Sequence, residues 1–110
     1  MMIRAALLDL HRALVEEERR EHEKTLGRLS GGEFLQALIS DPVFAWLRPL
    51  TTLIVRLEEL GDKPDADVLA AARELLSADA EFRQRCTALI QRSPDVAFAF
   101  AAAKRALERK

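Results

Sequence analysis

The stretch 41–60 constrains the fold most strongly, because it carries the signals of a long buried helix. It begins with Asp41 and Pro42, which are typical of a helix N-cap and a first helical position, and Gly61 follows as a stop signal. Its apolar side chains recur at helical spacing: Val43, Trp46, Leu47, Leu50, Leu53, Ile54, Leu57 and Leu60. The sequence therefore predicts a central helix. Pro49 should bend it, because a proline cannot donate the usual backbone hydrogen bond.

The remaining sequence also predicts helices and no strands. Ser30 and Glu33 form a capping-box pattern at the start of one helix. We expect the other helices over these ranges: 3–26, 33–39, 65–77, 82–92 and 94–108. Whether Ala66 to Arg92 forms one helix or two stays open, with two favoured. The 110 residues suffice for one domain, so the expected fold is all-α: a compact bundle of five to six helices with a proline-bent central helix.

Composition and charge exclude several classes of protein. The formal net charge of −1 gives no general attraction to nucleic acid or to anionic membranes. A small basic end, formed by Arg105, Arg109 and Lys110, is the one place where nucleic acid could be contacted. Charged residues interrupt the apolar N-terminal stretch, which excludes a spanning helix there. The single Cys86 cannot form an internal disulfide and fits a reducing compartment. We therefore expect a cytoplasmic protein that binds neither nucleic acid nor a membrane.

Three polar residues of the first helix are the candidates for ligand binding. Glu18 and His22 lie one helical turn apart and could hold one metal ion or ligand together. His11 shares their face, but it lies about 16 Å from His22 along the axis, so the two histidines cannot share an ion. The alternative, which we prefer, is that these side chains make structural hydrogen bonds within the bundle. We predict no catalytic residue, no metal site and no cofactor.

Other potentially reactive or exposed residues also have a structural interpretation. Cys86 falls on an apolar stripe, where a thiol behaves as a small hydrophobic side chain. Phe98 points roughly opposite Phe100 and could be packed against a second neighbour. If Phe98 and Phe44 are both exposed, they mark an association surface, most simply that of a homodimer.

Two segments resemble a group of short, all-helical bacterial proteins. The first is Leu10-His11-Arg12-Ala13-Leu14 followed by Glu18, which matches an LHxALxxxE helix. The second is the stretch 41–54, which matches a DPxFAWLRPLxxLI segment. The resemblance covers the first half of the chain, and past Gly61 only the rhythm of helices is similar. It implies a helical fold and a bacterial source, and it brings no activity or catalytic residue with it.

The sequence favours a protein that is not an enzyme. A broad apolar face without a reactive cluster indicates a helical bundle that acts through protein–protein interaction or self-association, with a homodimer or a protein partner. The alternative is a helical bundle that binds a small ligand or a metal through polar residues of its first helix.

Overall fold

The computed structural model describes residues 2–28, 30–61 and 65–108. Within these ranges it contains six α-helices, one 3₁₀ helix and no strand, which confirms the all-α fold. The elements are α1 (Met2–Leu26), α2 (Gly31–Ser40), η1 (Pro42–Leu47), α3 (Arg48–Glu59), α4 (Ala66–Ser77), α5 (Ala80–Ile90) and α6 (Pro94–Glu108).

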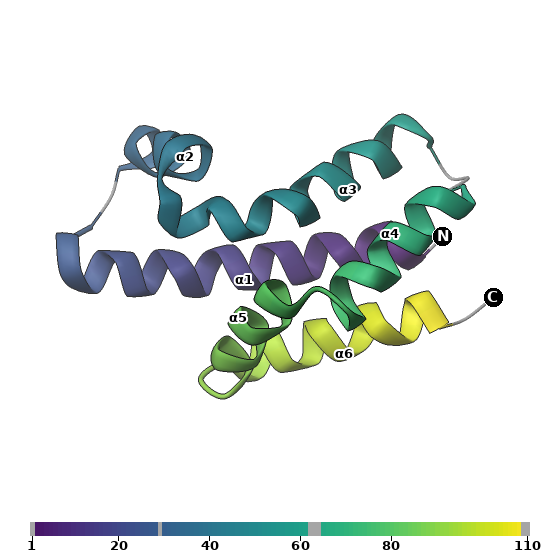
Figure 1. Ribbon diagram of the computed structural model, residues 1–110. Helices are drawn as coiled ribbons and strands as arrows, with labels where there is room; N and C mark the ends of the chain where they lie inside the picture. The colour runs from purple at the N-terminus through teal and green to yellow at the C-terminus, as the bar shows by residue number, and fades with distance from the viewer. Residues whose placement is uncertain (1, 29, 62–64, 109–110) are drawn as a thin grey trace.

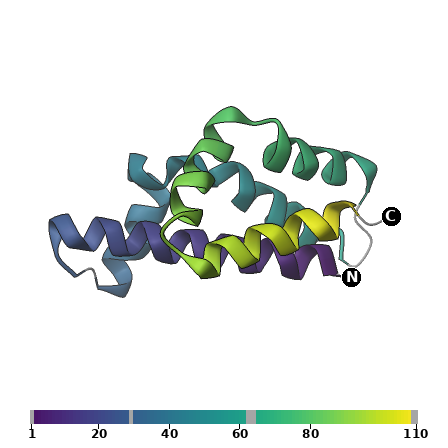
Figure 2. The same ribbon diagram turned by 90° about the horizontal axis from the view of Figure 1, so that it is seen from below.

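The longest helix, α1, runs through the middle of the bundle (Figure 1). Helices α3 and α6 both contact α1, and both run antiparallel to it. Helices α4 and α5 connect α3 to α6, and α4 contacts both of those helices (Figure 2). Helix α2 lies apart from this arrangement, across the C-terminal end of α1. The molecule is therefore a bundle around α1 with one helix at its margin.

The predicted central helix is divided into two parts at Pro49. Residues Pro42–Leu47 form the 3₁₀ helix η1, and the α-helix begins at Arg48, so that Pro49 lies in its first turn. A proline is favourable there, because the first backbone N–H groups of a helix have no partner within it. The proline thus interrupts the stretch more strongly than the expected bend. Leu60 lies beyond the end of α3 and is 39% exposed, so the expectation that it is buried is wrong.

The hydrophobic core lies between α1 and the helices on either side of it. Trp46 of η1 is 6% exposed, and its ring packs against Phe82 of α5 at a centroid distance of 5.5 Å. The α1 side contributes Ile3, Leu7, Leu10 and Leu14, and the α6 side contributes Val96, Ala103 and Leu107. The predicted burial of Trp46 is confirmed. The core is continuous from α1 to every other helix except α2, which has no buried residue.

Side-chain caps define where several helices begin. The capping box is confirmed: Glu33 N–H donates to Ser30 Oγ at 3.2 Å, and Ser30 N–H donates to Glu33 Oε1 at 3.0 Å. The Asp79 carboxylate accepts from the N–H of Phe82 at 3.0 Å, which starts α5. This cap separates α4 from α5, so the region from Ala66 to Arg92 contains two helices.

No single helix in the described ranges is both long and apolar enough to cross a membrane. By length and composition alone, one pair of segments passes together, residues 31–40 and 44–59, but they meet at an angle of 75°.

Candidate functional site

The two histidines of α1 contact the first turn of α3 and the residue that precedes η1. The Nε2 atom of His11 lies 2.8 Å from Oγ1 of Thr51 in α3. The Nε2 atom of His22 lies 3.2 Å from Oδ2 of Asp41, which precedes η1. The ring of His22 also stacks on Phe44 at a centroid distance of 5.9 Å. Because His22 follows His11 by eleven residues in α1, these contacts are spread along the helix by about 16 Å. The histidines therefore do not share a site.

Glu18 lies between these contacts and faces the indole of Trp46. The pKa of the Glu18 carboxyl is raised, and burial is the main cause. Glu21 also raises the pKa, whereas the Trp46 indole and the charges of Arg85 and Arg92 lower it. The Trp46 Nε1 atom is buried and makes no hydrogen bond of ordinary geometry with the described residues. The indole and the carboxylate are thus close enough to interact without a well-formed hydrogen bond. Glu18 joins α1 to η1 through Trp46, whereas His11 and His22 contact Thr51 and Asp41.

The hydrogen bond of His11 indicates which nitrogen carries its proton. The Thr51 hydroxyl donates to the carbonyl oxygen of Leu47 at 3.2 Å, so its oxygen is left to accept a hydrogen bond from His11 Nε2–H. Burial lowers the pKa of His11 below its ordinary value. A neutral imidazole with its proton on Nε2 satisfies both observations. His11 therefore donates a structural hydrogen bond across the α1–α3 contact.

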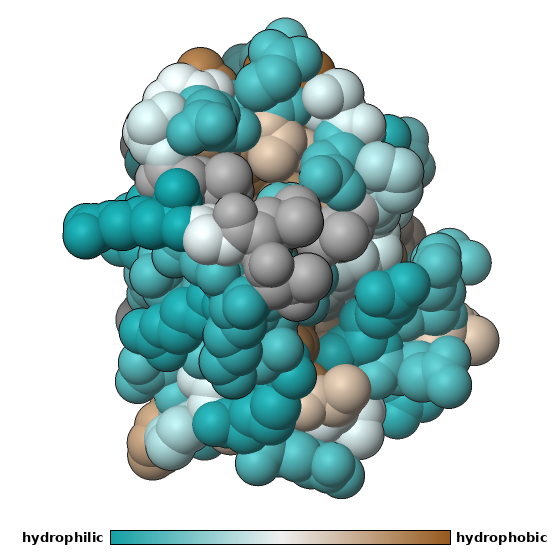
Figure 3. Space-filling model, turned by 90° about the vertical axis from the view of Figure 1, so that its left-hand side faces the viewer, coloured by the Kyte–Doolittle hydropathy of each residue, from teal (hydrophilic) through white to brown (hydrophobic). Residues whose placement is uncertain are grey.

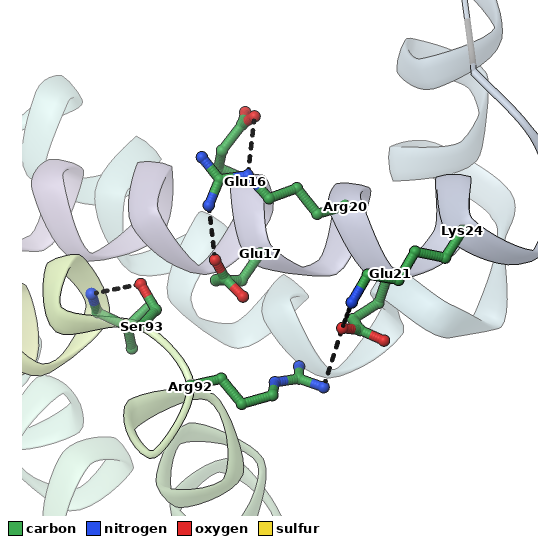
Figure 4. A network of polar contacts seen from close by, with 8 residues as sticks. Glu16, Glu17, Arg20, Glu21, Lys24, Arg92 and Ser93 are labelled. Atoms are coloured by element: carbon green, nitrogen blue, oxygen red, sulfur yellow. Dashed lines mark hydrogen bonds and ion pairs between the residues drawn. The ribbon is translucent and has the colours of Figure 1, made fainter.

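A second group of polar contacts joins α1 to the junction between α5 and α6 (Figure 4). The Glu21 carboxylate lies 3.0 Å from Lys24 Nζ and 3.2 Å from Arg92 Nη1, and Arg92 directly precedes the cap of α6. The buried Glu17 binds Arg20 at 2.8 Å on the same side of α1. Partly exposed ion pairs of this kind contribute little to stability, because water screens them. They orient the junction and form no reactive centre.

Neither a metal site nor a reactive cysteine is found among the described residues. In the described part of the chain, no group of three or more His, Cys, Asp or Glu side chains is arranged to hold a metal ion. Cys86 is 1% exposed, and burial raises the pKa of its thiol to about 12. A thiol with so high a pKa is a poor nucleophile at neutral pH. Cys86 belongs to the core, as its position on the apolar stripe predicts.

Helix α2 exposes apolar side chains. Leu35 is 59% exposed and Ile39 is 63% exposed, and the two lie one turn apart on a helix that has no buried residue. Phe34 attaches the helix to the bundle: its ring meets Phe44 edge-on at 5.8 Å, and the Arg19 guanidinium lies 4.6 Å from its centroid. Hydrophilic residues cover most of the end of the molecule seen in Figure 3, so exposed apolar side chains are local features of the surface.

A pocket of about 290 Å³ lies between α2 and the α1–α3 contact. Leu38 and Ile39 line it from α2, Phe44 and Leu47 from η1, and His11, Arg48 and Thr51 complete it. Arg48 is held at this pocket by a hydrogen bond of 2.8 Å from its Nη2 atom to the carbonyl oxygen of Ile39. Of the three candidate ligand-binding residues of α1, only His11 lines this pocket.

The two phenylalanines expected at an association surface have opposite environments. Phe44 is 1% exposed, so the condition that both phenylalanines be exposed is not met: its ring contacts those of His22 and Phe34 in the core. Phe98 is 76% exposed, the highest exposure of any large apolar side chain in the described residues. It stands beside a shallow groove of about 480 Å³ between α1 and α6.

The exposed apolar pair on α2 was not among the residues singled out from the sequence. The signal was present in the segment 31–40, where the apolar residues span about 200° of the helix circumference at 100° per residue, a wider arc than one contact surface buries. No protein-family model, curated protein or solved structure matches this chain.

Proposed function

We propose that the protein is not an enzyme and acts by binding a partner protein through α2 and the pocket beside it. We call this surface the α2 face and define it by Leu35, Leu38, Ile39 and Arg48, with the buried Leu47 lining the pocket beneath them. The observation that supports the proposal most directly is the exposure of Leu35 and Ile39, each by more than half, on neighbouring turns. Exposed apolar groups that adjoin an apolar pocket are typical of protein interaction sites.

The chemistry of the α2 face favours an amphipathic helix as the partner segment. Its pocket is lined mainly by apolar side chains, and a helix can present apolar anchors to such a groove at a spacing of three or four residues. Arg48 is exposed at the pocket, and none of the described residues that line the pocket is acidic. A carboxylate on the partner helix, next to its apolar anchors, would pair with Arg48. The proposed partner is therefore an acidic amphipathic helix.

A small apolar ligand is the alternative occupant of the same pocket. A volume of about 290 Å³ lies at the lower end of the range for small-molecule sites, and His11 lines the pocket as the polar group that such sites usually contain. The exposed Leu35 and Ile39 favour the protein partner, because they extend the apolar area from the pocket onto the outer surface of α2. A ligand enclosed in the pocket would leave that outer surface uncovered. A cytoplasmic location is part of the proposal and is supported by the single, buried cysteine.

The test is a titration of the isotope-labelled protein with a synthetic helical peptide of leucine and glutamate, followed by NMR. We expect shifts of the amide signals of α2 and of Leu47 and Arg48. A matched peptide with lysine in place of glutamate should bind more weakly, and Arg48→Glu should reverse this preference. The double substitution Leu35→Glu/Ile39→Glu should abolish binding, while Phe98→Glu, on an exposed residue of α6, should leave it unchanged.

Two outcomes would contradict the proposal. If neither peptide shifts the signals of α2, the α2 face does not bind amphipathic helices. If decanoate, a small apolar carboxylate, shifts the pocket residues while the peptides do not, the ligand alternative replaces the protein partner.

A further inference from the structure

A second surface, on α6, has a pattern that is complementary to itself. Asp95, Phe98, Ala102 and Arg105 follow one another at steps of three, four and three residues, so they form one stripe along the helix. Three of them are exposed, Ala102 is partly exposed, and Phe98 alone is 76% exposed. Val96, Ala103 and Leu107, on the other side of α6, are buried in the bundle. We call these four residues the α6 stripe.

The groove beside the stripe has a floor of small side chains. Ala99 and Ala102 of α6 and Ala13 of α1 line it, and Phe98 stands at its edge. The groove volume is about 480 Å³, and α1 adds charged residues of both signs to its lining. The small side chains allow another helix to approach closely. A large aromatic ring from that helix could then lie on the alanines.

We propose that two copies of the chain form a symmetric dimer in which their α6 stripes pack antiparallel. When the two-fold axis passes between Phe98 and Ala102, Phe98 of each copy lies over Ala102 of the other. The same register brings Asp95 of each copy opposite Arg105 of the other. Phe98 thus meets the small Ala102, and Asp95 meets the basic Arg105. Each of these contacts occurs twice, because a two-fold axis repeats every contact of the interface.

The charges exclude the parallel arrangement of the same two stripes. In a parallel pair, Asp95 would face Asp95 and Arg105 would face Arg105, and like charges at an interface oppose association. The ring of Phe98 would also meet its own copy, and the alanine floor would be left uncovered. A second copy is therefore favoured over an unrelated partner, because one stripe supplies the anchor, the floor and both charges.

The dimer should be weak and should depend on protein concentration. Its centre is a single helix pair with two buried phenylalanines, which is at the small end of specific interfaces. The proposal does not depend on the α2 face, because none of the residues that define one surface belongs to the other.

Sedimentation of two charge-reversed variants, Asp95→Arg and Arg105→Asp, tests the register. In either variant alone, like charges meet twice, so we expect the dimerisation constant to weaken by about tenfold or more. When the two variants are mixed, every pair again joins an acid to a base, so the mixture should form dimers about as well as the unaltered chain. Phe98→Glu should give a monomer, whereas Leu35→Glu/Ile39→Glu should leave dimerisation unchanged.

The mixture makes the test independent of folding defects. A variant that merely fails to fold cannot be rescued by mixing it with the other variant, and circular dichroism of each variant alone checks that both are folded. The proposal is overturned if the unaltered chain stays monomeric at all concentrations. It is equally overturned if the single variants dimerise as well as the unaltered chain, or if their mixture stays monomeric.

Discussion

His22 of α1 lies 3.2 Å from Asp41 through its Nε2 atom, and its ring stacks on the neighbouring Phe44. The side chain of His22 is only 6% exposed, and its Nδ1 atom is buried without a hydrogen-bond partner in the described part of the chain. His22 thus contacts both Asp41, which precedes η1, and the ring of Phe44 within η1. These contacts engage His22 in packing within the bundle, although the sequence made it a candidate for binding a ligand.

We predict that His22→Ala lowers the free energy of unfolding by about 1–3 kcal/mol, since it removes both the stacking and the hydrogen bond. His22→Phe should cost less, because it keeps a ring against Phe44 and removes the unpartnered nitrogen. Urea unfolding of both variants measures the difference. Equal losses for the two variants would contradict this expectation and would show that the hydrogen bond to Asp41, and not the stacking on Phe44, supplies the stability.

Trp46→Ala should be among the most destabilising substitutions. The side chain is 6% exposed and packs against Phe82, so its removal leaves a large cavity between η1 and α5. Substitutions of this kind cost about 3–5 kcal/mol, a large part of the stability of an ordinary domain. Calorimetry should show a greatly lowered melting temperature. A melting temperature close to that of the unaltered protein would contradict the assignment of Trp46 to the core.

The stability should depend on pH through His11. Burial lowers the pKa of His11, so the unfolded chain binds its proton more readily than the folded protein does. As the pH falls below the unfolded pKa of about 6.5, His11 therefore destabilises the fold progressively. This loss of stability reaches its full size once the pH lies below the folded pKa. Thermal unfolding of the unaltered protein and of His11→Gln at several pH values isolates this effect. Loss of stability with acid should be smaller in the variant, and two parallel pH profiles would contradict the prediction.

Cys86 should resist thiol reagents while the protein is folded. Its side chain is 1% exposed, and its pKa is raised to about 12, so the reactive thiolate is both rare and inaccessible. We expect labelling by a disulfide reagent only at the rate of unfolding, and rapid labelling in denaturant. Fast labelling without denaturant would show that α5 opens readily.

Helix boundaries could be predicted from the sequence wherever a local side chain decides them. Ser30, Asp65 and Asp79 cap the helices that follow, and each cap depends only on residues three positions apart. The division at Pro49 into a 3₁₀ helix and an α-helix could not be derived in the same way, because proline permits either a bend or a new start. The surrounding core, with Trp46 buried on one side of the division, selects the new start.

The candidate site was less predictable, because it depends on which side chains the tertiary structure leaves uncovered. Helical spacing places Phe44 off the main apolar stripe, yet the packing of α2 and His22 buries it. The helical spacing of the segment 31–40 indicates more apolar residues than one surface can bury, but it does not say that Leu35 is one of those left exposed. That result follows from the position of α2 at the margin of the bundle, where it contacts the bundle mainly through η1.

The proposed binding role of α2 requires that its exposed apolar residues, Leu35 and Ile39, are not needed for folding. The free energy of unfolding of Leu35→Glu/Ile39→Glu, measured in urea, tests it most directly, with Leu38→Glu in the partly buried pocket wall as the contrast. We predict that the double variant stays within about 0.5 kcal/mol of the unaltered protein, as surface substitutions do, while Leu38→Glu is clearly destabilised. A loss of more than about 2 kcal/mol in the double variant would show that Leu35 and Ile39 hold the fold together, and would contradict the claim.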